Sequence, residues 1–578
     1  MKRIPFFILI AGFFMPAVLT QAAEKSPVKL TVLNSMERIS QNDAPFGESQ
    51  AQIKAARNEV ESFQVVVNAP NETIQVIKAE MSDLAGKGGT IGKEYIALFR
   101  EEFVRVRRSS PRAEYPPGLY PDPLVPFINT LTGQQIEPRG QFQEKWGAPV
   151  VTKGFEMYAA PFTVWKDQNQ PLWVDVSIPR NAAAGVYSGT FTLTLRNDVS
   201  ATVPVTVTVW DFTLPDGPSH RNHFGGVQNA ARFFGAEQNS DRYREIEMRY
   251  CRMMADHRIN PPLPRSLMPE VNDDGSLKIT PERHQALKKF IEDMHVSDFE
   301  IPRAPIKDAV GANRDKALRY YRDYYRYVKE NGWEKWAYLY MLDEPNLKEN
   351  YEEVLALGAL VHQAAPEMRC LVVEQPYQQD PSWPGIDPAV DIWCPLFSFI
   401  DRDSIDAKLA HGDEVWSYTA LAQRSPRYHP HYEEVKNYDP PYWHIEHPLA
   451  AYRIPTWINW QYKITGLLYW STVTTVIEPW LNPALSHYGT HCNGEGYLIY
   501  PGAPCGIDGP ISCMRLKNLR DGMEDYEYFA LLEKMAGREA VTKIVSTVAP
   551  NWWDCAKDPK AFLAAREKIA GEILKLKR

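Results

Sequence analysis

Hydrophobic and polar residues alternate with a period of two through the first third of the chain. Helical periodicity is absent between residues 29 and 214, so we predict a β-sandwich domain over residues 24–215. Four stretches show the alternation most clearly, and turn residues separate them at intervals typical of sandwich strands: IQVIKAEM, PLWVDVSIP, YSGTFTLTL and ATVPVTVTVW.

Residues 107–149 break this alternation. Prolines and aromatic residues crowd the segment, as in SSPRAEYPPGLYPDPLVPF. This composition predicts a long ordered loop, and loops of this length in compact domains are often functional. We expect the loop to lean over the cleft of the next domain.

After residue 220 the pattern changes to short apolar runs separated by segments that are mostly helical in period. Runs that are apolar on both faces suit strands covered on both sides, as in a parallel sheet. Eight such runs can be counted: NHFGGV, INPPLP, DFEIPRA, WAYLYMLDEP, RCLVVEQP, DIWCPL, EVWSYTAL and GLLYWST. Eight is the number of strands in a closed (β/α)8 TIM barrel. We therefore predict a multidomain chain with such a barrel over residues 220–536, a last barrel helix at residues 515–535, and a helical tail at residues 537–578.

The first 22 residues read as a secretory signal peptide. Lys2 and Arg3 precede an apolar stretch at residues 5–19, and a small-x-small cleavage site follows at residues 20–22. No cysteine follows the site, so a lipid anchor is not indicated. No later stretch reaches ~18 apolar residues, so the mature chain should have no membrane span. We expect an exported protein, periplasmic or secreted.

The mature chain carries seven cysteines, and export permits disulfides. One bridge among Cys492, Cys505 and Cys513 is plausible, whereas Cys370 and Cys394 lie in predicted core strands and should be buried thiols. No Cys/His spacing matches a zinc site. Four histidines gather in the late loops in no known metal-binding pattern, so we expect no metal: His444, His447, His487 and His491.

Composition narrows the possible partners. The net charge is −8 without long blocks of either sign, which gives no electrostatic footprint for nucleic acid. Aromatic residues make up 12% of the chain. They indicate either large cores or surfaces on which the apolar faces of sugars stack.

Two adjacent acids, Asp343 and Glu344, end the fourth predicted strand, and Pro345 follows them. The C-terminal ends of barrel strands are where barrel enzymes carry their chemistry. The alternative is a purely structural role, in which Asp343 caps the next helix and Glu344 is a solvated charge in a loop. In an exported, aromatic-rich barrel chain, the pair first suggests glycoside hydrolysis, which usually needs an acid and a second carboxylate.

A conventional second carboxylate is hard to find across the predicted barrel. The seventh and eighth strands end in WSY and YWS. Glu374 on the fifth strand is the remaining candidate, but we interpret it as a hydrogen-bonding residue in substrate binding. In substrate-assisted hydrolysis the 2-acetamido oxygen of the sugar is itself the nucleophile, so one acid and one amide-orienting carboxylate suffice.

Aromatic strand ends supply the rest of the predicted binding site. Tyr418 could donate to the acetamido oxygen, and Trp393, Trp416 or Trp470 could wall the pocket. Tyr340, two residues from the end of the fourth strand, is a further candidate. Glu495, in the loop after the eighth strand, could hold sugar hydroxyls or could equally be a turn residue. We interpret Arg453, and the RDGMEDY stretch that begins at Arg520, as structural residues that form salt bridges and pack helices together.

Several ordered motifs make the chain resemble the family 123 glycoside hydrolases. They are the Asp343-Glu344 pair, RIPTW from Arg453, GLLYW from Gly466, GEGYLIYPG from Gly494, and a long helical motif, ISCMRLKNLRDGMEDYEYF. The N-terminal ARNEVESFQVVV and GLYPDPLVP also look like that group. The resemblance spans about residues 29–532. It implies an exo-acting β-N-acetylgalactosaminidase with a sandwich followed by a barrel, Glu344 as general acid/base and Asp343 as the acetamido-orienting residue.

The sequence therefore predicts a retaining exo-β-N-acetylhexosaminidase that needs no cofactor. Its substrate would be a glycolipid, glycoprotein or oligosaccharide with a terminal N-acetylhexosamine. Two alternatives stay open: a glycosidase for a sugar without the acetamido group, with a carboxylate nucleophile, and a glycan-binding protein without activity.

Overall fold

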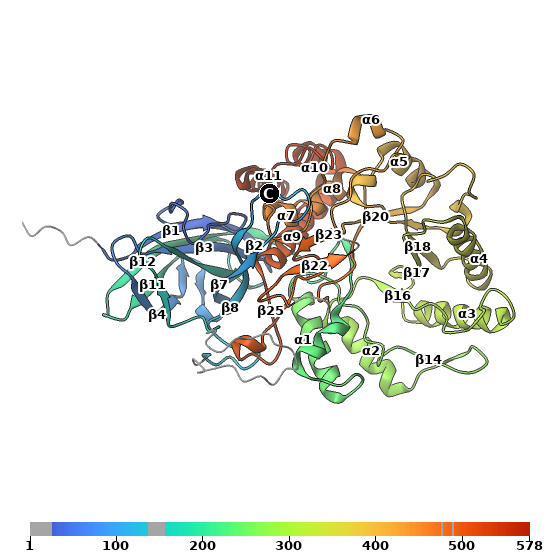
Figure 1. Cartoon of the computed structure of the whole chain (residues 1–578), viewed down its shortest axis with the longest axis horizontal. Coiled ribbons are helices and arrows are strands. Elements are labelled where there is room, and N and C mark those ends of the chain that lie inside the picture. The colour runs from blue at the N-terminus through green and yellow to red at the C-terminus, as the bar shows by residue number, and fades with distance from the viewer. Residues whose placement is uncertain (1–25, 137–156, 475–477, 488–489, 578) are drawn as a thin grey trace, which may run out of the picture.

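The computed structural model describes residues 26–136, 157–474, 478–487 and 490–577. Figure 1 shows a β-sheet region formed by the N-terminal part of the chain beside a region of strands and helices formed by the rest. The predicted signal peptide and residues 137–149 of the predicted loop lie outside the described residues. None of the helices within the described ranges combines the length and the hydrophobicity needed to cross a membrane.

Two sheets form the N-terminal region, and all four predicted strands are present in them. The first sheet has the order β1 (Lys29–Asn34), β3 (Val60–Asn68), β10 (Asn169–Ser177), β7 (Ile96–Val106) and β8 (Gly118–Pro126). The second has the order β2 (Ala51–Arg57), β12 (Ser200–Thr213), β11 (Gly185–Leu195), β4 (Ile74–Met81) and β9 (Phe162–Val164), with β5 (Leu84–Gly86) and β6 (Gly89–Ile91) at its side.

Strict alternation along the strands builds the core between these sheets. In β12 the side chains of Val203, Val205, Val207 and Val209 are all buried, and the residues between them are more exposed. The buried valines belong to one cluster with residues of the opposite sheet, such as Val65. A period of two therefore places one apolar face of each sheet against the other.

The predicted loop at residues 107–149 contains a strand. β8 occupies residues 118–126 and pairs with β7 at the edge of the first sheet. Prolines 121, 123 and 126 are tolerated because an edge strand leaves part of its backbone without ladder bonds. The backbone N–H of Leu124 instead donates to the carbonyl of Ser512, 3.0 Å away, in the C-terminal part of the chain. The segment thus joins the two parts.

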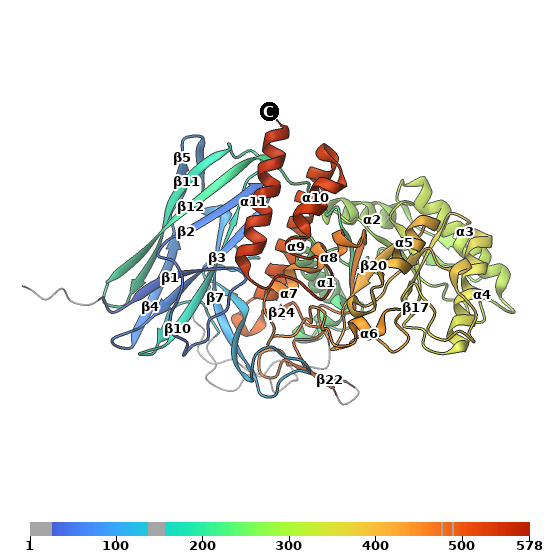
Figure 2. The same ribbon diagram turned by 90° about the horizontal axis from the view of Figure 1, so that it is seen from above.

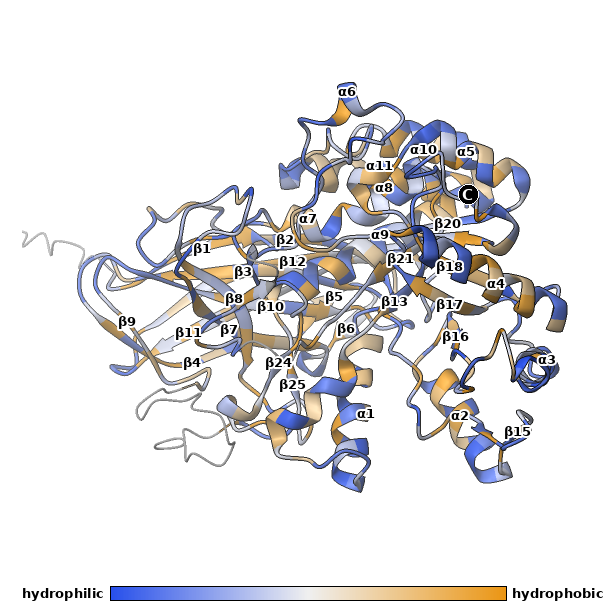
Figure 3. Cartoon of the chain, turned by 45° about the vertical axis from the view of Figure 1, so that its right-hand side comes forward, coloured by the Kyte–Doolittle hydropathy of each residue, from blue (hydrophilic) through white to orange (hydrophobic). Residues whose placement is uncertain are grey.

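Seven parallel strands form the sheet of the C-terminal part. Their order is β13 (Arg221–Phe224), β21 (Gly466–Tyr469), β20 (Glu414–Tyr418), β19 (Ile392–Trp393), β18 (Arg369–Val373), β17 (Ala337–Asp343) and β16 (Phe299–Ile301). Each neighbouring pair is parallel. Hydrophobic colour concentrates on the strands, whereas the peripheral helix α3 is mostly hydrophilic (Figure 3).

Helices follow most of these strands, as the pattern predicts. They are α1 (Asp241–Ala255), α2 (Pro281–Asp293), α3 (Arg314–Glu330), α4 (Lys348–Ala364), α5 (Arg402–His411), α7 (Ala450–Arg453) and α8 (Pro455–Gln461). Smaller elements fill the connections: η1 (Lys93–Tyr95), η2 (Val227–Phe234), η3 (Asp387–Ala389), η4 (Phe397–Phe399), η5 (Ala503–Cys505), α6 (Tyr432–Val435), β14 (Glu270–Val271), β15 (Leu277–Lys278), β22 (Ala484–His487), β23 (Thr490–Asn493), β24 (Tyr500–Pro501) and β25 (Pro510–Ile511).

The predicted second strand, INPPLP from Ile259, is not a strand, so the expected eight-stranded barrel is wrong in this detail. β13 and β16 are the two ends of the sheet, and residues 259–264 lie outside any strand. The three prolines of INPPLP have no N–H for a ladder. The side-chain amide of Asn260 links the two sides. Its Nδ2 donates to the carbonyl of Asn222 in β13 at 2.9 Å, and its Oδ1 accepts from the backbone N–H of Ser297, two residues before β16, at 3.0 Å. We call this opening between β13 and β16 the gap.

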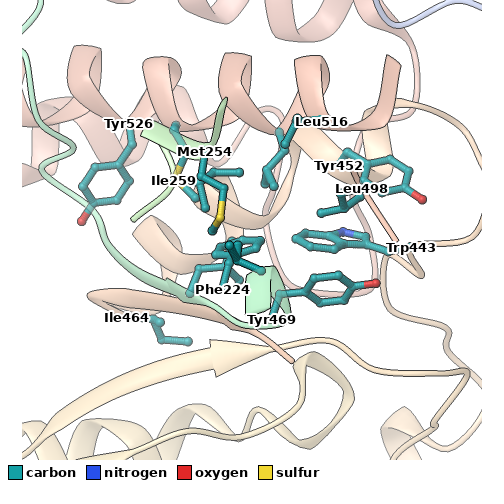
Figure 4. Close-up of a cluster of buried hydrophobic side chains, with 14 of the residues drawn as sticks. Phe224, Met254, Ile259, Trp443, Tyr452, Ile464, Tyr469, Leu498, Leu516 and Tyr526 are labelled. Atoms are coloured by element: carbon teal, nitrogen blue, oxygen red, sulfur yellow. The ribbon is translucent and has the colours of Figure 1, made fainter. Parts of the chain in front are cut away.

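A long buried helix, α9 (Met514–Ala536), lies between the sandwich and the parallel sheet (Figure 2). Every residue from Met514 to Phe529 is buried, although many of them are charged. Below the helix, Phe224, Trp443 and Tyr469 pack together, with ring centroids of Trp443 and Tyr469 4.7 Å apart (Figure 4). The helix is therefore the common core of both parts of the chain.

Ion pairs satisfy the buried charges of α9. Arg515 donates to both carboxylate oxygens of Asp122 on β8, at 2.8 and 2.9 Å. Two residues further on, Lys517 pairs with Asp175 on β10 at 2.7 Å. Since a buried charge without a partner is costly, these pairs fix how the sandwich docks onto the helix.

Arg453 makes the corresponding contact on the side of the parallel sheet. Its guanidinium donates two bonds of 2.7 Å to Asp525 of α9, and both side chains are almost fully buried. Gly522 allows the close crossing, because a Cβ there would lie 2.6 Å from the carbonyl oxygen of Arg453. The structural interpretation of Arg453 and of the RDGMEDY stretch agrees with these contacts.

The chain ends in two helices that pack on α9, namely α10 (Arg538–Val545) and α11 (Pro559–Leu576). Arg566 of α11 reaches the sandwich, where it bonds the carboxylates of Glu59 and Glu61. The seven cysteines of the mature chain all lie in described residues and are all free thiols. The bridge considered among Cys492, Cys505 and Cys513 is therefore absent.

Arg453→Met should lower the free energy of unfolding by about 3–5 kcal/mol, because it leaves the buried Asp525 carboxylate without its main partner. Urea denaturation of the mature chain measures this change. The matched control is Lys543→Met at an exposed helical pair with Glu539, which should leave the midpoint nearly unchanged. Equal midpoints for the two variants would contradict the structural role of Arg453.

Candidate active site

The backbone at the end of β17 explains how two adjacent acids face one cavity. Tyr340 pairs with Leu371 and Leu342 with Val372, so Met341 is an extra residue, a β-bulge. Without the bulge, strict alternation from Tyr340 would turn Asp343 away from the sheet interior.

Glu344 then adopts a left-handed conformation, with φ of 43°. This conformation is uncommon for a residue with a side chain and clusters at functional sites. Together the bulge and the turn at Glu344 bring both carboxylates into the same cavity.

A cavity of about 760 Å³ opens at the C-terminal ends of the strands. Both Asp343 and Glu344 line it and are solvent-exposed. Of the predicted substrate-binding residues, Tyr340, Tyr418 and Trp470 also line it. The structure thus brings together five of the nine predicted site residues.

Two tyrosines hold the acid pair. Tyr340 donates its hydroxyl to Asp343 at 2.9 Å, and Tyr418 donates its hydroxyl to Glu344. Burial, followed by the negative charge of the neighbouring carboxylate, raises the pKa of each tyrosine above its usual range. Both hydroxyls therefore stay protonated and act as donors. Tyr418 was expected to reach the acetamido group of a sugar, but without a sugar its partner is Glu344.

Trp470 forms one wall of the cavity and is 41% exposed. Its indole Nε1 donates to Glu495 at 2.7 Å, and Glu495 itself is buried outside the cavity lining. Gly496 lies against the ring, since a Cβ on it would be 2.2 Å from an indole carbon. Glu495 therefore orients the tryptophan rather than contacting a ligand, and the GEG motif is the cradle of that side chain.

Glu374 points away from the cavity. Val373, before it, faces the interior of the sheet, so Glu374 faces α4 and accepts hydrogen bonds from Tyr351 and Gln379 at 2.9 and 2.8 Å. Burial raises the pKa of Glu374 to about 8. At neutral pH this carboxyl is mostly protonated, and its hydrogen bonds are to other residues of the protein, so it does not occupy the substrate-binding position that the sequence predicted.

Trp393 and Trp416 do not line the cavity. Trp416 is fully buried in the sheet interior, where its ring stacks edge-on with Tyr338. Trp393 lies on the outer side of the sheet, and its Nε1 donates to Asp413 at 3.0 Å. Alternation along β19 turns Trp393 outward, whereas Trp416 faces the interior two residues before Tyr418 on β20 and so lies below the cavity.

The cavity lining also includes polar residues that the sequence did not single out, among them His223 on β13 and Glu300 on β16. His223 Nδ1 lies 3.2 Å from Asp298 and its Nε2 lies 3.5 Å from Glu300. A weak signal existed: each residue occupies an alternate position within a predicted strand run, NHFGGV and DFEIPRA. The two residues approach each other because β13 and β16 face one another across the gap.

Two of the four histidines in the late loops lie beside carboxylates. His444 is fully buried beside Glu495, and His447 lies near Glu114. Elsewhere, His362, Cys370 and Asp391 have ligand atoms within 4.8 Å of one another. Asp391 there accepts from the backbone N–H of Cys370 and bonds His362, which is an ordinary structural arrangement.

Two sequence profiles of one family match the chain. The profile described as Glycoside hydrolase 123, catalytic domain, matches residues 249–532, and the Glycoside hydrolase 123 N-terminal domain matches residues 124–195. The chain belongs to glycoside hydrolase family 123. The resemblance read from the motifs is confirmed, and the chain is a glycoside hydrolase.

A solved structure supports the same fold. It is a family 123 glycoside hydrolase from Clostridium perfringens, described as giving the details of glycolipid glycan hydrolysis. It covers 95% of this chain and 98% of its own, with a TM-score of 0.66 and 14% sequence identity. At this identity the match shows a shared fold.

Other solved structures are more distant. A family 5 xyloglucanase from Bacteroides ovatus is 9% identical over 86% of this chain and 100% of its own, with a TM-score of 0.24. A chitinase from a Paenibacillus species is 8% identical over 70% of this chain and 44% of its own, with a TM-score of 0.18. TM-scores this low do not indicate a shared overall fold. No curated protein sequence matches this family 123 chain.

Gly496→Ala should lower kcat/KM for hydrolysis by roughly 10-fold to 100-fold, because the new methyl group displaces the Trp470 ring. Gly332→Ala is the matched control: Gly332 has φ of 70° against 66° for Gly496, but open space where its Cβ would be. Both variants should lose about 1–2 kcal/mol of stability through left-handed strain. Steady-state kinetics and denaturation of both variants separate the two effects, and unchanged kinetics in Gly496→Ala would refute the cradle.

Proposed function

We propose that the chain is an exported, exo-acting, retaining β-N-acetylhexosaminidase that prefers N-acetylgalactosamine. The observation that carries this proposal is the entry of Asp343 and Glu344 into one cavity from consecutive positions. Adjacent Cα atoms are ~3.8 Å apart, so both carboxylates would contact the same side of one sugar. That arrangement suits an acid beside an amide-orienting group, the pair that substrate assistance requires.

Glu344 is the proposed general acid. It would protonate the glycosidic oxygen while the acetamido oxygen of the substrate attacks the anomeric carbon from the opposite face and forms an oxazoline. The same carboxylate then takes a proton from water, which opens the oxazoline with overall retention.

Asp343 is the proposed partner of the acetamido group. As a carboxylate it accepts the amide N–H and stabilises the positive charge that develops during ring closure. The hydrogen bond from Tyr340 to Asp343 occupies one oxygen and orients the other. Trp470 would bind an apolar face of the sugar, which places the ring between the indole and the acid pair.

The runner-up is a glycosidase that uses a carboxylate nucleophile on a sugar without the acetamido group. Glu374 fits this role poorly, because it faces α4 and is mostly protonated at neutral pH. Glu300 is the other carboxylate of the cavity lining. A 2-fluoro sugar would trap a covalent adduct on such a nucleophile, and mass spectrometry of peptides would locate it.

Substrate and location are proposals of the same kind. The Clostridium perfringens enzyme is described as hydrolysing glycolipid glycans, and we propose a glycan with a terminal N-acetylhexosamine, carried by a glycolipid, glycoprotein or oligosaccharide, as the substrate here. A panel of aryl glycosides of N-acetylgalactosamine, N-acetylglucosamine, galactose and glucose tests the sugar. Hydrolysis of none of them would favour a glycan-binding protein without activity. Cell fractionation tests export to the periplasm or medium.

Glu344→Gln should reduce kcat on glycosides with poor leaving groups by about 10²–10⁴-fold, since general acid catalysis supplies that factor. Dinitrophenyl glycosides, which need little protonation, should be affected much less. Asp343→Asn should slow both substrate types by about 10²–10³-fold, because oxazoline formation precedes either departure. The exposed Glu349→Gln on α4 is the control. Equal dependence on leaving group in both active-site variants would exclude this division of roles.

A thiazoline analogue of the oxazoline should inhibit competitively and bind at least 10²-fold more tightly than the corresponding sugar. Asp343→Asn should weaken the analogue more than Glu349→Gln does, because Asp343 holds its ring nitrogen. Isothermal titration calorimetry gives both affinities. Failure of the unmodified chain to bind the thiazoline would overturn the substrate-assisted mechanism.

A further inference from the structure

The cavity has a second polar pair at the gap, His223 and Glu300, for which hydrolysis as described has no use. They come from β13 and β16, the two end strands of the sheet, each of which lacks a strand partner on the side of the gap. Both line the same cavity as the acid pair. The gap is thus closed by side chains where a barrel would have backbone bonds.

His223 is held in one orientation. Its Nδ1 lies 3.2 Å from the buried Asp298, whose same oxygen accepts the Tyr338 hydroxyl at 2.9 Å. Although burial lowers it, the hydrogen bond to Asp298 and the charge of Glu300 raise the pKa of His223 to about 9. A protonated imidazole has two N–H donors, so Nε2 presents its proton toward Glu300.

The distance between His223 Nε2 and Glu300 Oε2 is 3.5 Å, longer than a close charge-assisted bond. Among the described residues no group donates a hydrogen bond of normal length to the Glu300 carboxylate, whose side chain is 40% exposed. The pair therefore presents one donor and one acceptor side by side. A hydroxyl group, which is both acceptor and donor, has the matching chemistry.

Position along the strands places this pair deeper than the acids. Glu300 is level with Tyr338 in the register of β16 and β17, and His223 is level with Leu468. Asp343 and Glu344 lie at the C-terminal end of β17, at the rim. A terminal sugar whose anomeric carbon is at the rim would point the opposite end of its ring, carbon 4, toward the gap.

We propose that His223 and Glu300 bind the 4-hydroxyl of the terminal sugar and determine the choice between C4 epimers. This inference rests on the proposed glycosidase function. The histidine donates to the hydroxyl oxygen, and the hydroxyl donates to the carboxylate. A chain extended at carbon 4 would collide with the pair, which also explains exo-action.

The test combines variants with a deoxy substrate. For the unmodified chain, kcat/KM should be roughly 10–100-fold lower on 4-nitrophenyl 4-deoxy-β-N-acetylgalactosaminide than on its parent, the range for a lost bond to a charged group. Glu300→Gln should lose a similar factor on the parent but stay within about threefold of the unmodified chain on the deoxy substrate. His223→Gln should behave likewise, and Glu330→Gln, exposed on α3, is the matched control.

Other outcomes are decisive. Equal losses of kcat/KM on the parent and 4-deoxy substrates in both variants would show that the pair only closes the gap. A larger loss of kcat/KM on a 6-deoxy substrate than on the 4-deoxy substrate would place the contact at another hydroxyl. Trapping of Glu300 by a 2-fluoro sugar would make it the nucleophile; each of these results overturns the inference. If a variant fails to fold, equal kcat/KM of the unmodified chain on parent and 4-deoxy substrate overturns it as well.

Failure of the proposed function has a different signature. If the unmodified chain hydrolyses only glycosides without an acetamido group, the N-acetylhexosaminidase proposal fails, and the same comparison on the 4-deoxy form of that sugar supports or overturns the role of His223 and Glu300. If it hydrolyses no glycoside of the panel, both proposals fall.

Discussion

Each charge buried along α9 needs a partner, and this need holds the two parts of the chain together. Asp122 and Asp175 on the sandwich neutralise Arg515 and Lys517, and Arg453 on the other side neutralises Asp525. Removing either part would leave buried charges unpaired, at several kcal/mol each. The sandwich is therefore part of the framework that supports the strands of the active site. The loop that contacts Trp470 depends on the sandwich as well, because Arg515, which pairs with Asp122, also donates to the carbonyl of Gly494.

Local backbone irregularities produce the active site on this framework. The bulge at Met341 and the left-handed Glu344 turn two adjacent acids into one cavity, and Gly496 of the GEG motif lets the loop approach the indole of Trp470. Such conformations cost energy and persist because the surrounding packing imposes them. Here a parallel sheet neighbour, β18, and the buried Glu495 supply that constraint.

The gap between β13 and β16 gives the cavity its shape. Prolines in residues 259–264 prevent a strand, and Asn260 replaces part of the missing ladder with its side-chain amide. Nearer the rim, His223 and Glu300 take the place that backbone groups would fill. An opening lined by charged side chains differs from a closed barrel wall, because it can exchange bonds with a sugar without breaking the sheet.

Periodicity and turn residues in the sequence alone determined most elements, the order of sandwich and parallel sheet, and the acid pair, because these signals are local to each segment. INPPLP was misread as a strand since its apolar run outweighed its three prolines. Asp343, Glu344, Tyr340, Tyr418 and Trp470 were predicted at strand ends and meet in the cavity. The side that Trp393 and Glu374 face depends on one-residue alternation in short strands, and Trp416 lies too deep along β20 to reach the cavity. The role of Glu495 and the meeting of His223 with Glu300 were decided only by tertiary structure, because each joins residues far apart in the chain through a loop or a gap that no local pattern encodes.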